Sequence, residues 1–495
     1  MSRRLGVYLA TLAVALSGCG GGGGSKPPAA PDPLGDALAY LPAQALAVGT
    51  VSTQLENGQG GQLAQRLARI PATQLLLGDA SNLASEAGLS LDDLRAQAGN
   101  PVAIAVPDLI DVTGDRIPLV AWAVRDAGSL QESLDGAVDR KRVDPAGTHR
   151  GVALFRAQDG APAFALAGGI LLLAKDADTL RLAIDRHAQK RGLTQRELAD
   201  RLQGTPATAP VRFSVSAPVA LAGPRFAELR KIPWVAALER ATLAVGADEQ
   251  RITAVARFDT SESDLIVGDL PVAGGTGAPA IPRFGALRAG LLAPGDTLLF
   301  AQEVWKALNP GGYRIFEAAQ GPIQQAGVDP QLDLLDELVG PATLSTDLQD
   351  SKLRIGLRDP EGFADALTRS RFLLGPLLAT LGVPGLQFTV APDGATQVSV
   401  NALVVARLAV VNGQFVVTTK DPDLARVERA PRTREPGAEG AFVVRMQSRR
   451  LRATAAKAVG LPERAGFALD GIGDGTLVVR SEPAGTTAVL RLDVR

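Results

Sequence analysis

An internal repeat is the feature that most constrains how this chain of 495 residues can fold. The stretch 242–259 contains Thr-Leu-Ala-Val and then Thr-Ala-Val-Ala-Arg-Phe-Asp. The stretch 476–493 contains Thr-Leu-Val-Val and Thr-Ala-Val-Leu-Arg-Leu-Asp at the same spacing. Eight of these 18 aligned positions are identical, whereas unrelated stretches of average composition share roughly one or two. A repeat at one offset indicates two copies of one structural unit.

The rest of the two halves aligns in the same order. Each copy is expected to open with a turn into a first strand, then to form a capped helix ending at glycine, a strand running into a helix, and a hairpin strand running into another helix. The matching segments are, in that order, 41–46 with 293–298, 87–99 with 326–340, 125–134 with 358–367, and 169–178 with 413–423. We therefore predict repeat unit 1 at residues 36–262 and repeat unit 2 at residues 283–495. Residues 263–282, rich in turn formers, are interpreted as a linker, with a long ordered connection across a shared sheet as the alternative.

The strands come in runs joined by short turns, which predicts a largely antiparallel sheet. Within a copy we expect a strand, helices, two strands, a helix, a run of three strands, helices, a strand, a helix and a closing hairpin. The apolar run 164–174 is too short to span a bilayer, and Gly168 and Gly169 at its centre predict a hairpin. This pattern favours an α+β fold of two tandem copies, with helices packed on one face of the sheets, over a doubly wound parallel fold.

Residues 1–18 have the form of a lipoprotein signal peptide, with Arg3 and Arg4 before a short apolar run. The sequence Leu-Ser-Gly-Cys that ends at Cys19 resembles the lipobox of bacterial lipoproteins, where the cysteine becomes the first residue and carries a diacylglyceryl group. Cys19 is the chain's single cysteine, so it has no disulfide partner within the chain. Residues 19–35 have the Gly/Pro-rich composition of a tether. We predict lipid attachment at Cys19, with acyl chains such as palmitate, and anchoring to the outer face of the cell membrane or within the cell envelope.

A family resemblance agrees with this prediction. Together with the lipobox, the turn Leu41-Pro42-Ala43 and the predicted helix from Gly88 to the segment Gly99-Asn100-Pro101 resemble a family of bacterial envelope lipoproteins known only as a domain of unknown function. The resemblance covers most of the chain after the signal peptide. It implies an envelope lipoprotein with a repeated α+β unit, and it implies no activity, ligand or site.

Charge and motif analysis argue against a nucleic-acid partner. The chain has 51 Lys and Arg against 52 Asp and Glu, which leaves no basic excess to attract phosphates. Residues 192–202 are similar to the second helix of a helix-turn-helix domain, but Pro206 and Pro210 stand where the recognition helix is needed. Thr194 and Glu197 are interpreted as a capping box on a surface helix.

Few residues suited to catalysis are present. With two histidines and one cysteine, the chain has neither a Cys/His metal cluster nor an H-E-x-x-H motif, and we expect no metal and no cofactor. A Ser-His-Asp site would need His149, expected in a loop, or His187, expected in an Arg-rich helix, and no G-x-S-x-G motif is present. A pair of carboxylates, as in glycosidases, stays open. The carboxylates at 92–93 and 176–178 are interpreted as caps of helix N-termini rather than as a cation site.

Two further features allow two interpretations each. The first is a basic cluster, which we expect either to lie on a solvated helix face or to meet anionic head groups or an envelope polymer. It consists of Arg445, Arg449, Arg450, Arg452 and Lys457. The apolar helix expected at 363–381 is a core helix or the wall of a ligand cavity.

The function that these observations favour is that of a non-catalytic, lipid-anchored binding or scaffold protein of the envelope. The expected partners are the membrane, through the lipid on Cys19, and an apolar ligand or another envelope protein. The alternatives are an extracytoplasmic hydrolase, using His149, His187 or a carboxylate pair in a site between the two repeats, and a regulator or inhibitor of a secreted enzyme.

Overall fold

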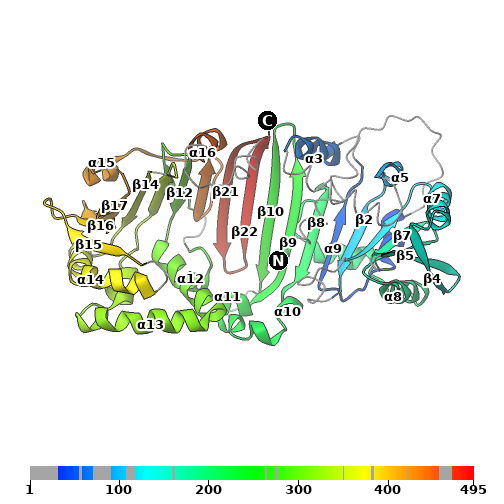
Figure 1. Cartoon of the computed structure of the whole chain (residues 1–495), viewed down its shortest axis with the longest axis horizontal. Coiled ribbons are helices and arrows are strands. Elements are labelled where there is room, and N and C mark those ends of the chain that lie inside the picture. Colours follow the sequence, from blue (N-terminus) through cyan, green and yellow to red (C-terminus); the bar gives the residue numbers. More distant parts are fainter. Residues whose placement is uncertain are drawn as a thin grey trace.

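The computed structural model describes most of the chain after the tether. The described residues are 32–54, 58–70, 91–107, 118–158, 162–261, 265–273, 277–348, 350–380, 384–420, 422–455 and 471–494. Cys19 and the rest of residues 1–31 lie outside them. The described part folds around one large antiparallel β-sheet (Figure 1).

The first half of this sheet, which we call copy 1, contains ten strands. They are β1 (Ala47–Val51), β2 (Val102–Val106), β3 (Leu119–Ala123), β4 (Val143–His149), β5 (Val152–Ala157), β6 (Ala163–Ala167), β7 (Ile170–Ala174), β8 (Val211–Ser216), β9 (Leu238–Ala247) and β10 (Arg251–Thr260). Their spatial order is β4-β5-β6-β7-β3-β2-β1-β8-β9-β10, and every neighbouring pair is antiparallel.

Copy 2 repeats this order strand for strand. Its strands are β12 (Leu287–Leu291), β13 (Ala342–Thr346), β14 (Ser351–Gly356), β15 (Leu386–Val390), β16 (Thr396–Val400), β17 (Leu403–Val411), β18 (Gln414–Thr418), β20 (Phe442–Met446), β21 (Ile472–Glu482) and β22 (Gly485–Val494). They lie in the order β15-β16-β17-β18-β14-β13-β12-β20-β21-β22. The α+β fold with two tandem copies and an antiparallel sheet is confirmed.

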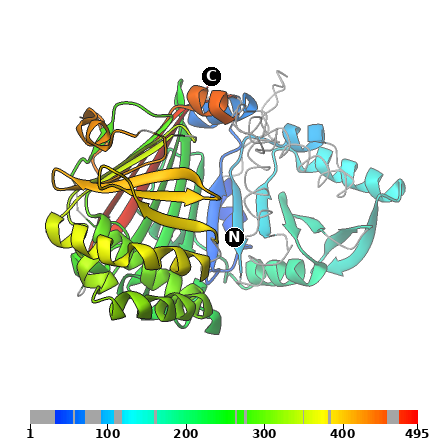
Figure 2. The ribbon, with the colours of Figure 1, turned by 60° about the vertical axis from the view of Figure 1, so that its left-hand side comes forward.

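The two copies share one sheet, because β10 pairs with β22 along nine residue pairs. The two repeat units therefore form one shared sheet, as in the alternative given for the linker, and not two separate sheets. The boundaries at residues 262 and 283 stay predictions. In Figure 2 the outer strands of copy 2, drawn in yellow to orange, lie in front of the central strands, so the sheet is strongly curved.

The sheet has two faces, which we name by their core residues. Face 1 contains Val48, Ala103, Ala105 and Leu172, and face 2 contains the alternating residues Val102, Ile104, Trp122 and Leu171. Face 1 is continuous between the two copies, because directly paired residues on neighbouring strands point to the same face. The pairs are Val48 with Ser214, Ser214 with Thr242, Thr242 with Arg257, and Arg257 with Thr487 of copy 2. Side chains that alternate along a strand point to opposite faces, so the same face of both copies lies on one side of the molecule.

Helices cover both faces rather than the one face that we expected. On face 1 lie α2 (Pro33–Leu38), α8 (Ala177–Ala188) and α9 (Gln195–Arg201) in copy 1, and α15 (Leu424–Arg429) in copy 2. On face 2 lie α3 (Gly58–Ala68) and α7 (Ala127–Asp139) in copy 1, and α14 (Pro360–Thr380) in copy 2. The cause is that strands such as β2 carry apolar residues at every position, and two apolar faces need two covers.

The remaining helices are short or lie at the margin of the sheet. They are α5 (Leu91–Ala96), α10 (Ala217–Ala220), α11 (Pro233–Ala236), α12 (Pro294–Leu308), α13 (Pro310–Gln325), α16 (Ser448–Ala455), a π-helical turn at Pro330–Leu335, and 3₁₀ turns at Pro224–Phe226, Leu229–Lys231 and Val267–Asp269. A separate two-stranded ribbon pairs β11 (Ala280–Pro282) with β19 (Arg432–Arg434), so part of the expected linker is ordered.

Several local predictions are confirmed by hydrogen bonds. The run 164–174 is the β6–β7 hairpin, with Gly168 and Gly169 both at positive φ. Thr194 and Glu197 form the expected capping box on α9. Asp126 and Asp359 occupy matching positions before α7 and α14, where each carboxylate accepts a hydrogen bond from a backbone N–H three residues on.

Other local predictions are wrong. Residues 293–298 begin helix α12 rather than a first strand, and the true counterpart of the turn at 41–46 lies before β12. The run of three strands has four members, because the polar strand β4 carries Pro145 and a bulge that hide its pattern. The capped helix expected at 326–340 is a π-helical turn, although Asp329 does cap it. Residues 87–90 of its copy 1 counterpart lie outside the described residues.

Candidate functional site

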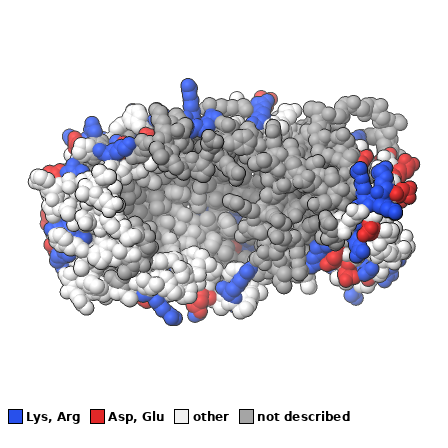
Figure 3. All heavy atoms as spheres, viewed as in Figure 1, with Lys and Arg blue, Asp and Glu red and all other residues white. Residues whose placement is uncertain are grey.

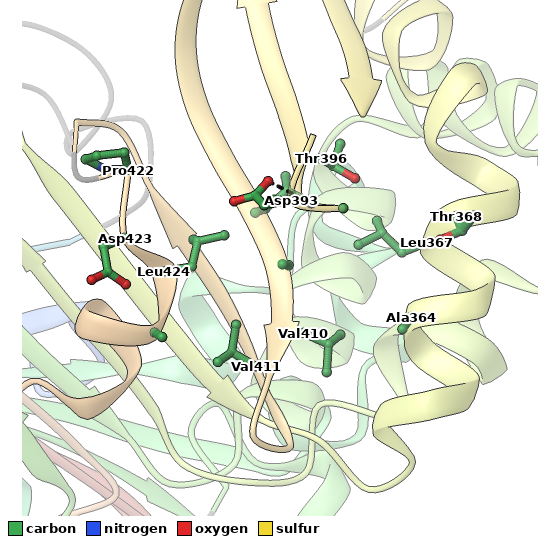
Figure 4. Close-up of a pocket in the computed structure, with 15 residues that line it drawn as sticks. Ala364, Leu367, Thr368, Asp393, Thr396, Val410, Val411, Pro422, Asp423 and Leu424 are labelled. Carbon is green, nitrogen blue, oxygen red and sulfur yellow. Dashed lines mark hydrogen bonds between the residues drawn. The ribbon is translucent and has the colours of Figure 1, made fainter. Parts of the chain in front are cut away.

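An open hollow lies at the outer end of copy 2. Its volume is about 570 Å³. The hollow extends along both sides of the end of β17: Ala364, Leu367 and Thr368 of α14 lie on the face 2 side, and the start of α15 lies on the face 1 side. The β15–β16 turn closes the top (Figure 4).

The hollow exists because copy 2 lacks the long helix that fills the same place in copy 1. Helix α8 has 12 residues, and its Leu180, Ala183 and Ile184 bury the face 1 side of β6 and β7. Its counterpart α15 has six residues and contributes Leu424 and Val427 to a small core. The floor strand is also longer in copy 2, with nine residues in β17 against five in β6. A shorter helix over a longer strand leaves space above the strand.

Charged groups hold the top of the hollow in place. Arg407 of β17 donates hydrogen bonds to the Asp393 carboxylate and to the backbone carbonyl of Pro422. The hydrogen bond from Arg407 lowers the pKa of Asp393, so this carboxyl stays ionised at neutral pH. Asp423 accepts from the backbone N–H of Arg426 and caps α15. These groups are engaged with one another. Most of the other lining residues have apolar side chains, but the surface exposed in the hollow is slightly more polar than apolar.

Apolar side chains are exposed at the same end of copy 2. Leu403 is 72% exposed and Val404 is 51% exposed, both at the start of β17, and Phe372 of α14 is 63% exposed. Val390 and Val405 are exposed as well. These side chains are spread along the strands, since Val390 pairs with Thr396 at one end of the ladder and Leu403 pairs with Val400 at the other.

The corresponding end of copy 1 is polar. His149, the last residue of β4, lies with its Nε2 2.9 Å from Asp185 Oδ1 on α8, and the adjacent Arg150 donates to the same oxygen. His149 is therefore in a strand and not in the expected loop. The hydrogen bonds from Arg150 and His149 lower the pKa of Asp185. This cluster ties the β4–β5 hairpin to α8.

The structure does not bring the two histidines into one site. His187 lies in α8, as expected, and its ring stacks on Tyr40 at a centroid distance of 4.3 Å. The Tyr40 hydroxyl donates to the carbonyl of Ala167. The hydrolase alternative places its site between the repeats, where the described residues form the continuous β10–β22 ladder.

One of the two carboxylate pairs expected at helix N-termini caps a helix. Asp176 caps α8 by accepting from the backbone N–H of Thr179. No group of three or more His, Cys, Asp or Glu within the described ranges is arranged to hold a metal ion. Among the helices of the described part, none is long and apolar enough to cross a bilayer. The side chain of Asp92 lies outside what the structure describes.

The residues of the expected basic cluster lie on different elements and differ in exposure. Arg445 lies on β20, donates to Thr476 at 2.8 Å and forms ion pairs with Glu435 and Asp474. Arg449 and Arg450 are exposed on α16, and Lys457 lies outside the described residues.

Helix α14 fits both of its expected interpretations. Phe363 and Ala366 are buried in the core, while Ala364, Leu367 and Thr368 line the hollow. The hollow itself was not predicted, because it depends on the length of α15 relative to α8.

Comparison with known proteins finds structural similarity and no sequence relative. No family model matches the chain, and no curated protein matches it. The fold is similar to TP0453, a membrane-associated lipoprotein of Treponema whose function is uncertain. Crystal form I of TP0453 shares 9% sequence identity at a TM-score of 0.30, over 46% of this chain and 81% of that one. Crystal form III shares 9% identity at a TM-score of 0.29, over 48% and 83%. Membership of the lipoprotein family of unknown function stays a prediction.

Proposed function

We propose that this protein is a non-catalytic binding protein of the bacterial envelope, anchored through a lipid on Cys19, and that it holds an apolar ligand in the hollow at the outer end of copy 2. The observation that supports this most is the difference between the two copies. The face 1 side of the sheet is covered by Leu180, Ala183 and Ile184 of α8 in copy 1, whereas the corresponding place beside β17 is open in copy 2.

The size and lining of the hollow suit part of a lipid or another apolar molecule. Ligand sites of about 300–1,000 Å³ with apolar walls and a few polar groups are typical of small-molecule binding. Leu408 and Val410 face α14, and Ala409 and Val411 face α15. On the α15 side, Ala409 and Val411 lie on the same face as the Arg407–Asp393 pair, and this arrangement would orient a molecule with a polar head and an apolar chain.

Binding of a fluorescent long-chain fatty acid tests this proposal. The chain carrying Cys19→Ser is purified without detergent and titrated with the probe. Ala409→Trp places a large ring in the hollow, and we expect it to weaken binding by about tenfold or more, a loss of roughly 1.4 kcal/mol. The control is Leu182→Trp, which adds the same ring to an exposed position on α8. Equal weakening by both variants, or by neither, would contradict the proposed site.

Native mass spectrometry of the same preparation distinguishes the alternatives. A bound lipid supports the proposal, whereas a stoichiometric protein indicates a scaffold or an inhibitor of that protein. Turnover of a substrate that is abolished by His149→Ala or His187→Ala would favour the hydrolase instead.

A further inference from the structure

The tether joins the folded body on face 1. The first described residue, Asp32, caps α2 by accepting from the backbone N–H of Gly35, and it also accepts from Gln195 of α9 at 2.6 Å. Both helices belong to the face 1 core through Leu38 and Leu198. The chain therefore enters the folded body on the side that face 1 occupies. The 13 residues from Cys19 to Pro31 reach at most about 45 Å when fully extended.

The β11–β19 ribbon covers face 1 of copy 2. Ile281 of β11 is fully buried and packs with Val443 and Val478, two face 1 residues of β20 and β21. From the sheet below, Arg288 donates to the carbonyls of Pro282 and Arg283. These contacts fix the ribbon against the sheet and leave its other side toward solvent.

The solvent side of this cover is rich in arginine. We name it the ribbon surface, and its residues are Arg283, Phe284, Arg429, Arg432 and Arg434, all exposed. Phe284 is 66% exposed directly beside Arg283. Arg449 and Arg450 of α16 extend the charge along the rim of copy 2, where Figure 3 shows Lys and Arg in blue above α15 and α16 of Figure 1.

Buried arginines strengthen the positive charge of this side. Arg288 is 8% exposed and Arg354 is 4% exposed, and both belong to face 1 of copy 2. Arg354 donates to the carbonyls of Glu428 and Ala430, just before the ribbon strand β19. Burial and the charge of Arg432 lower the pKa of Arg354 to about 10, so it stays protonated at neutral pH.

The acids around the ribbon surface only partly balance its charge. Glu435 is engaged by Arg445 in an ion pair. Glu428 is buried under the ribbon and accepts from Asn412, and Glu439 is exposed. The helices that we place on face 2 have no basic excess: α7 carries Glu132, Asp135 and Asp139, and α14 carries two acids and two arginines, while α3 carries Arg66.

We propose that the ribbon surface binds anionic lipid head groups of the same bilayer that holds the Cys19 lipid, and that it thereby orients face 1 of the sheet toward the membrane. This inference rests on the lipid anchor of the proposed function. The arginines meet lipid phosphates, and Phe284 enters the interfacial region. A single lipid attachment is strengthened by a basic patch in the same way in other anchored proteins. An exposed aromatic ring suits a membrane interface better than a soluble polymer.

Vesicle sedimentation with the purified Cys19→Ser chain tests the surface without the anchor, so its outcome is independent of whether Cys19 is lipidated. We expect binding to vesicles of phosphatidylglycerol mixed with phosphatidylcholine, weak binding to phosphatidylcholine alone, and loss of binding at high salt. The triple variant Arg283→Gln, Arg432→Gln, Arg434→Gln should weaken binding by roughly fivefold for each arginine removed. The control triple variant is Lys306→Gln, Arg314→Gln, Arg369→Gln on α12, α13 and α14, and it should bind like the parent chain.

Phe284→Ser provides a second test that leaves every charge in place and should weaken binding to the anionic vesicles. Equal binding to neutral and anionic vesicles would overturn the inference, and so would equal losses in the two triple variants. If polyphosphate competes fully with the vesicles and Phe284→Ser binds like the parent chain, the partner is a soluble polyanion and the membrane assignment is wrong.

Discussion

Val255 of β10 lies directly opposite Val489 of β22, the residue that matches it in the internal repeat. The neighbouring pairs are symmetric, with Thr253 opposite Arg491 and Arg257 opposite Thr487. An antiparallel register in which a residue faces its own counterpart places a local two-fold axis between the two strands. In Figure 1 half a turn about the line of view brings α7 toward α14 and α8 toward α15. The repeat therefore forms a pseudo-symmetric pair of units within one sheet.

The register at this seam predicts a disulfide. In a Cys19→Ser background, Val255→Cys with Val489→Cys should oxidise readily, because directly opposed residues of an antiparallel pair have Cα atoms about 4.5–5.5 Å apart. Non-reducing electrophoresis and peptide mass spectrometry detect the bond. The control pair is Ala256→Cys with Val489→Cys, whose side chains point to opposite faces and should stay reduced. Oxidation of both pairs would show that the register differs.

Arg354 should be important for the stability of copy 2. Replacing it with Met removes the donor to the buried carbonyl of Glu428 and to the partly buried carbonyl of Ala430. We expect the free energy of unfolding to fall by about 2–4 kcal/mol. Urea unfolding followed by circular dichroism measures this. Lys352→Met on the same strand, two residues away and more exposed, is the control and should change stability by less than about 1 kcal/mol.

The Asp185 cluster predicts a pH-dependent contribution to stability. Hydrogen bonds from Arg150 and His149 lower the pKa of Asp185 in the folded chain. A carboxyl with a depressed pKa adds stability above its unfolded pKa of about 3.9, and this contribution is lost as the pH falls through the folded value. Asp185→Asn should therefore destabilise the protein at neutral pH, and the difference from the parent chain should shrink in acid. Asp139→Asn, on the exposed end of α7, is the matched control. A difference that stays constant between neutral and acidic pH would contradict this assignment.

Cys19 is predicted to carry the lipid that holds the protein in the membrane fraction of cells. Cys19→Ser should block lipid attachment and release the chain from that fraction after a salt and carbonate wash, which removes proteins held by charge alone. Immunoblotting of the fractions measures the shift, with an unrelated lipoprotein as the loading control. Retention of the intact variant in the washed membranes would mean that another attachment is sufficient.

The sequence by itself determined the elements whose signals are local or repeated. The identical residues of the two closing hairpins predicted two copies, and Gly168 with Gly169 predicted the β6–β7 turn, because a tight hairpin needs positive φ at these positions. The carboxylates at 176–178 predicted the cap at Asp176, which acts within three residues of itself. Asp126 and Asp359 cap the helices predicted after the matched strand ends in the same way. The lipobox around Cys19 is also a local signal, and lipid attachment there stays a prediction.

Only the tertiary structure decided how the copies join and where they differ. The pairing of Val255 with Val489 links residues far apart in the chain, and period-two patterns within a strand do not specify which strand will be its neighbour. The same limit concealed the hollow, which depends on α15 being shorter than α8 above equivalent strands. It also concealed the ribbon surface, because Arg283 and Arg432 become neighbours only when β11 pairs with β19. Such features depend on packing between distant segments, which a local sequence pattern does not encode.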